Sequence, residues 1–141
     1  MRFLTAYYAI SSKSVLMTGT ERMKNRPISI LVDALRSLGA DIEYVEKEGF
    51  PPLKINGKQL QGGELHIKGD VSSQYLSAIL MIAPYTLGGI KLVIEGDLVS
   101  RPYLQMTLSL TKEASNISMR QLSQQATVKV LEKCSKLQHL I

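Results

Sequence analysis

Hydrophobic positions along the chain predict short strands alternating with one-sided helices up to about residue 111. The segment 14–18 is rich in β-favouring residues and ends at Gly19, a pattern typical of a strand followed by a turn. Asn25 is a plausible N-cap for a first helix, and Pro27 fits its first turn. The apolar positions that follow have the i, i+3, i+4, i+7 spacing of one helix face: Ile28, Leu31, Val32 and Leu35. Gly39 is a typical C-terminal stop for this helix.

The pattern continues with more strands and two more helices. Four segments have the composition of short strands: 41–45, 53–55, 64–68 and 90–94. A second helix, with Asp70 or Ser72 as its N-cap, carries an apolar face made of Leu76, Ile79, Leu80 and Ala83. A third helix is predicted after the sequence Ser100-Arg101-Pro102.

The chain also contains an internal repeat of about 75 residues. Three pairs of segments align at similar offsets: 2–6 with 74–78, 17–19 with 94–96, and 26–27 with 101–102. Chance is the alternative, because strand–glycine–loop–helix arrangements are common. Duplicated units of this kind predict an α/β (α+β) fold in which helices pack on one side of small mixed sheets.

Composition limits the class of protein. The chain has 141 residues, of which 45% are hydrophobic and 21% charged, so most of it is expected to fold around a core. One cysteine, Cys134, cannot form an intrachain disulfide and favours a reducing, cytoplasmic location. The most apolar stretch, 75–85, is shorter than the ~20 residues that span a bilayer. The first residues also lack the features of a secretory signal.

The end of the chain differs from the rest. All 10 glycines lie at or before Gly96, and all 5 prolines lie at or before Pro102. Residues 112–141 carry five Lys or Arg and two Glu, but no aromatic residue, so nucleic-acid binding is disfavoured. We therefore expect a folded part at 1–111 and a divergent tail at 112–141. An amphipathic helix over 127–140 would pack on the domain or pair copies of the chain, and an unfolded tail is the alternative.

Two loops carry groups that bind anions. The loop 19–27 holds three cations just before a helix, where free N–H groups also favour negative charge: Arg22, Lys24 and Arg26. The alternative is a solvated loop in which Arg26 pairs with Glu21 or Asp33. The second loop places Ser72, Ser73 and Gln74 at a helix start, with Ser100 and Tyr103 repeating the arrangement, although serine there more commonly only caps the helix. His66 and His139 are far apart, and no metal-ligand spacing or hydrolase motif is present.

Together these motifs resemble one family, the 3-phosphoshikimate 1-carboxyvinyltransferases, also called 5-enolpyruvylshikimate-3-phosphate synthases. The longest matching string is Leu-Met-Thr-Gly-Thr-Glu-Arg-Met-Lys-Asn-Arg-Pro-Ile, followed in family order by further segments: 16–28, 31–36, 44–53, 69–78 and 96–103. The resemblance implies repeated βαβαββ units in an incomplete enolpyruvyl-transferase domain. It also implies a cytoplasmic enzyme without a cofactor that moves enolpyruvyl from phosphoenolpyruvate to shikimate 3-phosphate.

Site residues follow from the resemblance by position. Ser72, Ser73 and Ser100 would bind shikimate 3-phosphate, and Tyr103 would line that side of the site. Gln74 would touch both substrates, while Arg22 and Arg2 would hold phosphoenolpyruvate.

Departures from the family pattern set a second expectation. The family's first unit and its second domain, with the acid and base groups, have no counterpart here, and no resemblance extends past residue 111. We therefore expect a fragment with a divergent end and no turnover by itself. The alternatives are a fragment similar to UDP-N-acetylglucosamine enolpyruvyl transferase, or a non-catalytic module whose tail forms a homo-oligomer.

Overall fold

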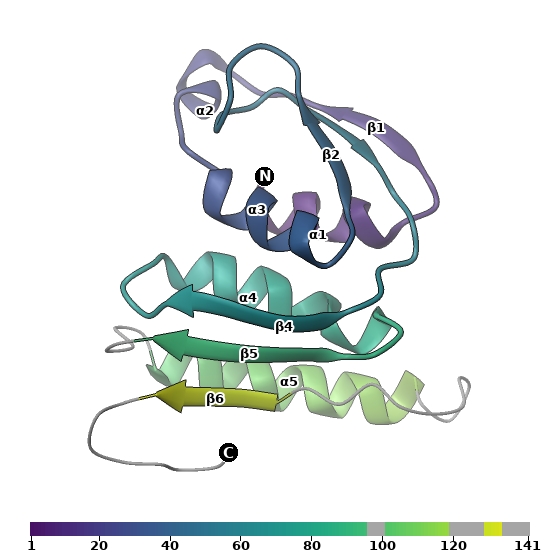
Figure 1. The fold of residues 1–141 in the computed structure, drawn as a ribbon, viewed down its shortest axis with the longest axis vertical. Coiled ribbons are helices and arrows are strands. Elements are labelled where there is room, and N and C mark those ends of the chain that lie inside the picture. The colour runs from purple at the N-terminus through teal and green to yellow at the C-terminus, as the bar shows by residue number, and fades with distance from the viewer. Residues whose placement is uncertain (96–100, 119–128, 134–141) are drawn as a thin grey trace.

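The computed structural model describes residues 1–95, 101–118 and 129–133, which form two small sheets with helices between and behind them (Figure 1). The elements follow in the order α1 (Arg2–Ile10), β1 (Ser14–Met17), α2 (Glu21–Lys24), α3 (Ser29–Ser37), β2 (Asp41–Tyr44), β3 (Leu53–Asn56), β4 (Gly63–Lys68), α4 (Ser73–Ile82), the 3₁₀ turn η1 (Ala83–Tyr85), β5 (Ile90–Glu95), α5 (Arg101–Ser118) and β6 (Lys129–Lys133).

The two sheets differ in strand direction. The first has the order β1-β3-β2, and both of its pairings are antiparallel. The second has the order β4-β5-β6, and both of its pairings are parallel, with α4 and α5 as the crossover helices. α1 and α3 pack on the first sheet, while α4 and α5 lie behind the second (Figure 1).

The core lies where the two halves meet. α3 buries the face that its spacing predicts, and Leu31, Val32 and Leu35 are inaccessible to solvent. α4 buries almost every residue from Tyr75 to Ile82, because it contacts α1, α3 and α5 and lies behind the second sheet (Figure 1). A helix that is apolar on most sides is stable only in such a central position. The start of α4 is thereby fixed against the start of α1.

The predicted α/β (α+β) class is confirmed, since helices pack on two small sheets, but the prediction of mixed sheets is wrong: in the described residues one sheet is antiparallel and the other parallel. The prediction that Asn25 caps α3 is wrong. Asn25 instead closes the short helix α2 by donating from Nδ2 to the carbonyl of Glu21 at 3.0 Å, and α3 begins at Ser29. A residue before proline avoids helical backbone angles, so Arg26 separates the two helices.

The predicted helix over residues 127–140 is partly wrong. Residues 129–133, inside the helix predicted over 127–140, form the strand β6 parallel to β5. Pairing satisfies the backbone groups along the second edge of β5, which an isolated helix would leave open. The remaining residues of that range lie outside the described part of the chain.

A linker of six residues, 57–62, joins the two sheets and is hydrogen-bonded to both halves. On the first half, Gly57 donates to the carbonyl of Lys13 and Lys58 donates to that of Ala9, at 3.0 and 3.1 Å. On the second half, Leu60 and Gln61 accept backbone hydrogen bonds from Leu87 and Gly88, at 3.0 and 2.9 Å. The linker is therefore part of the folded structure of both halves.

Candidate functional site

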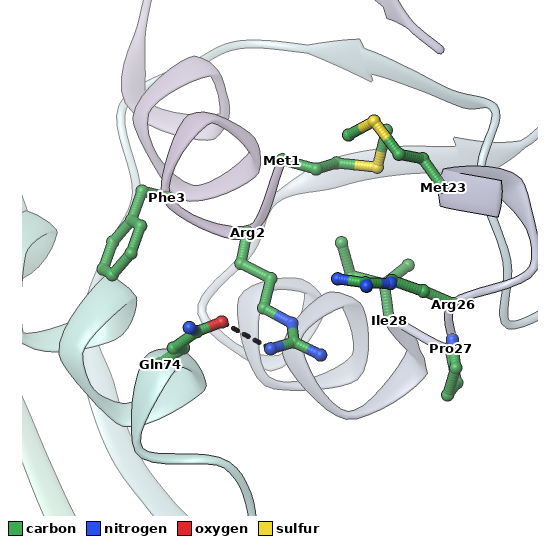
Figure 2. A pocket seen from close by; sticks show the side chains of 8 residues that line it. All are labelled: Met1, Arg2, Phe3, Met23, Arg26, Pro27, Ile28 and Gln74. Carbon is green, nitrogen blue, oxygen red and sulfur yellow. Dashed lines mark hydrogen bonds between the residues drawn. The ribbon is translucent and has the colours of Figure 1, made fainter. Parts of the chain in front are cut away.

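A pocket of about 150 Å³ opens where the start of α1, the loop after α2 and the start of α4 come together (Figure 2). Three polar side chains line it, and the rest of its wall is apolar: Arg2, Arg26 and Gln74, with Met1, Phe3, Met23, Pro27 and Ile28. No carboxylate and no histidine is among these lining residues.

Arg2 is held by three contacts from α4. Its Nη1 donates to Oε1 of Gln74 at 2.5 Å and lies 3.4 Å from Oγ of Ser72. Its guanidinium also stacks over the ring of Tyr75, 4.6 Å from the centroid, which is a cation–π geometry. Arginine has five donors, so these contacts leave N–H groups free to grip an anion in the pocket.

Arg26 enters the same pocket from the opposite wall (Figure 2). Among the described residues Arg26 forms no ion pair. The alternative of a solvated loop, in which Arg26 pairs with Glu21 or Asp33, is therefore not what the structure shows. Lys24 pairs with Glu21 and also with Glu46: its Nζ is 3.7 Å from Glu21 and 3.0 Å from Glu46, and the Glu46 hydrogen bond raises the pKa of Lys24. Arg26 therefore keeps its charge available for a ligand.

Ser72 does not cap α4 with its side chain, although it occupies the N-cap position. Its hydroxyl instead accepts from Arg2 at the rim of the pocket. The simple capping role weighed from the sequence is therefore not what the structure shows. A hydroxyl that accepts from Arg2 can still turn its own hydrogen toward an anion.

The other predicted site residues lie at different distances from this pocket. Ser73 is the half-buried first residue of α4, and Arg22 is exposed on α2 beside the pocket-lining Met23; neither lines the pocket. Tyr103 is 46% exposed on α5 and also lies outside it. Ser100 lies outside the described residues. The structure thus brings together Arg2, Gln74 and Ser72 of the predicted set.

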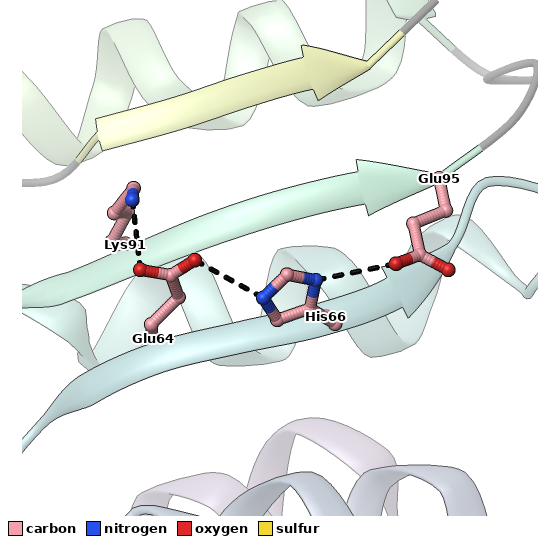
Figure 3. A network of polar contacts seen from close by, with 4 residues as sticks. All are labelled: Glu64, His66, Lys91 and Glu95. Atoms are coloured by element: carbon pink, nitrogen blue, oxygen red, sulfur yellow. Dashed lines mark hydrogen bonds and ion pairs between the residues drawn. The ribbon is translucent and has the colours of Figure 1, made fainter.

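A second polar cluster lies on the open face of the β4–β5 sheet (Figure 3). His66 lies between two carboxylates, with Nε2 3.1 Å from Glu64 and Nδ1 3.2 Å from Glu95. Lys91 donates to Glu64 at 2.7 Å, and this hydrogen bond is the main cause of a lowered pKa at Glu64. His66 is half exposed and lies on a strand face rather than in the pocket, so this cluster acts as surface pairing between neighbouring strands.

The sequence places Arg26 in an anion-binding loop but does not show which of its three cations enters the pocket, and it does not single out Tyr75. The repeated Arg-Pro dipeptide is a signal for Arg26, since one copy precedes α3 and the other begins α5. Tyr75 gave no such signal, because an aromatic residue in a first helical turn is common and only tertiary packing places its ring under Arg2.

Comparison with known proteins identifies one family. The family model described as EPSP synthase (3-phosphoshikimate 1-carboxyvinyltransferase) matches residues 1–141. The 3-phosphoshikimate 1-carboxyvinyltransferase of Bacteroides fragilis is 58% identical over 113 residues, which are 80% of this chain and 28% of the relative. That of Shewanella piezotolerans is 49% identical over 110 residues, which are 78% of this chain and 26% of the relative.

A solved structure agrees with these sequences. EPSP synthase from Acinetobacter baumannii superposes with a TM-score of 0.53 at 29% identity, over 60% of this chain and 19% of that chain. This chain therefore spans little more than a quarter of the length of the curated relatives. In the described part of the chain, no helix has the length and apolar character needed to cross a membrane.

Proposed function

The chain belongs to the EPSP synthase family of carboxyvinyltransferases in the shikimate pathway, and from this premise we propose that it forms one wall of that enzyme's substrate site. The main support for this proposal is the pocket between α1 and α4. It places two guanidinium groups and a carboxamide in one small space with no acidic group among the lining residues. Such a site attracts phosphate and carboxylate groups, which both substrates of the family carry.

Within this proposal each binding residue has a role. Arg2 and Gln74 contact phosphoenolpyruvate in the pocket, and Gln74 also faces shikimate 3-phosphate. Ser72 and Ser73 bind shikimate 3-phosphate at the start of α4, together with Tyr103 of α5 and with Ser100, which precedes Arg101 in the sequence. Arg22, on the exposed side of α2, approaches phosphoenolpyruvate from the rim.

We further propose that this chain alone does not turn over. Enolpyruvyl transfer requires one group to take the proton of the attacking hydroxyl and another to protonate the methylene carbon of phosphoenolpyruvate. The residues lining the pocket bind charge but include no carboxylate, histidine or lysine that could move these protons. The site therefore supplies binding without acid–base chemistry.

Calorimetry with shikimate 3-phosphate tests the site. Replacing both hydroxyls, Ser72→Ala with Ser73→Ala, should weaken binding about tenfold, since two hydrogen bonds of roughly 0.7 kcal/mol each sum to about 1.4 kcal/mol, which is a tenfold change in affinity. Ser109→Ala, at an exposed serine on α5, is the control and should bind like the wild type. Equal heats from the double variant and the wild type would contradict the site. Sustained phosphate release from both substrates would contradict the absence of turnover.

Assembly through residues 112–141 remains part of the proposal. β6 is an outer strand of its sheet among the described residues, and an outer strand exposes backbone groups that a second copy can pair. Sedimentation velocity of the full chain should then show a concentration-dependent dimer, and a monomer at all concentrations would exclude it.

Cys134 as the single cysteine supports a reducing compartment, which we take to be the cytoplasm.

A further inference from the structure

Tyr75 connects the two walls of the pocket. Its ring lies under the guanidinium of Arg2, 4.6 Å from the cation, and its hydroxyl donates to the backbone carbonyl of Pro27 at 2.8 Å. The side chain is 95% buried, so it has little freedom to leave either contact. One residue of α4 thus fixes the arginine of α1 and the loop that precedes α3.

The contact with Pro27 bears directly on Arg26. A residue before proline is restricted to extended backbone angles, and proline fixes its own φ, so the carbonyl of Pro27 and the Cα of Arg26 move together. Ile28 also donates its N–H to the carbonyl of Gly49 at 2.9 Å, which holds the other side of the same turn. These contacts aim the Arg26 side chain into the pocket, toward the wall that carries Arg2 (Figure 2).

The positive charges that face the pocket indicate that it binds an anion. Two guanidinium groups that face one pocket repel each other unless an anion lies between them, and no acidic side chain lines the pocket. A phosphate or carboxylate between two such forks accepts several charge-assisted hydrogen bonds at once.

We propose that Arg26 binds the same anionic group as Arg2, and that Tyr75 is the positioning residue that holds both arginines on that group. This rests on the proposed function, and it adds Arg26 as a substrate-binding residue and Tyr75 as the residue that orients it. The ligand is a phosphate ester or carboxylate of the size of phosphoenolpyruvate.

Phosphoenolpyruvate titrated into the full chain, followed by NMR, provides the test. Arg26→Gln should weaken binding about tenfold, and Arg26→Lys should weaken it less, because lysine keeps the charge but lacks the planar fork. Tyr75→Phe keeps the ring under Arg2 and removes only the Pro27 contact, so a loss of about threefold is expected. Lys13→Gln and Tyr85→Phe are the matched controls, since both side chains are exposed and lie outside the pocket.

A double-mutant cycle separates positioning from general stabilisation. If Tyr75 acts through Arg26, Tyr75→Phe should cost nothing further in the Arg26→Gln background. An equal loss in both backgrounds would overturn the role of Tyr75, and wild-type affinity in Arg26→Gln would overturn the role of Arg26. Arg26 is exposed, so its variants test the site even where a change at buried Tyr75 prevents folding. Absence of binding in the wild type would overturn the proposed function itself, and this inference with it.

Discussion

Gly62→Ala should lower the free energy of unfolding by about 3 kcal/mol or more, among the largest effects of any single substitution in the chain. Gly62 has φ +85°, a conformation that an alanine adopts only with strain. A Cβ there would lie 2.2 Å from the carbonyl oxygen of Gly89, which is backbone that cannot swing aside. That same oxygen accepts a hydrogen bond from Gly63 at 3.0 Å, so moving it disturbs the start of both β4 and β5.

Gly39→Ala isolates the backbone part of this effect. Gly39 follows α3 with φ +97°, and a Cβ there would meet nothing within 4 Å. Its substitution should therefore cost about 1 kcal/mol through conformational strain alone. Urea unfolding of the three proteins measures the difference. A Gly62→Ala loss no larger than that of Gly39→Ala would show that the strands separate to accommodate the methyl group.

Arg2→Gln is expected to weaken phosphoenolpyruvate binding about thirtyfold, because hydrogen bonds to charged groups contribute roughly 1.5–3 kcal/mol. Glutamine also removes the donor that orients Gln74 and Ser72, so more than one contact to the ligand is lost. The effect should decrease as salt is added, since the lost interaction is electrostatic. Calorimetry at two ionic strengths measures both quantities.

Arg36→Gln is a closely matched control for this change. Arg36 also stacks on a tyrosine, with its guanidinium 5.0 Å from the Tyr44 ring, and it donates twice to the carbonyl of Ile42. It lies outside the pocket, however, and loses the same formal charge when it is replaced. If both variants weaken binding equally, net charge rather than the site explains the loss.

Local patterns predicted most of the elements, because the residues that define them are close in sequence. The apolar spacing from Ile28 to Leu35 gave α3, and the alternation in 64–68 gave β4, whose Leu65 and Ile67 are buried. Asn25 was assigned to the wrong helix because its side chain suits either end of a helix, and spacing alone does not show which end it occupies.

The site could be predicted less completely than the helices and strands, because it depends on contacts between residues far apart in the sequence. The repeat aligned residue 2 with residue 74, yet it gave no reason for Arg2 and Gln74 to touch; their hydrogen bond exists because α1 packs against α4. The free charge of Arg26 follows from a competition that sequence does not settle, in which Lys24 takes Glu21 and Glu46. β6 likewise depends on pairing with β5, a strand far away in the chain. The spacing of apolar residues in the tail does not show this partner, and by itself it predicts a helix.

The anchored linker between the two sheets has a consequence for ligand selection. Backbone hydrogen bonds hold residues 57–61 on both sides, so the two halves cannot open and close about this connection without breaking them. Arg2 and Arg26, which belong to the first half, therefore keep their distance from Gln74 of the second half before any ligand arrives. Such a preorganised cavity should discriminate among small anions by size, with little entropic penalty for ordering the protein on capture.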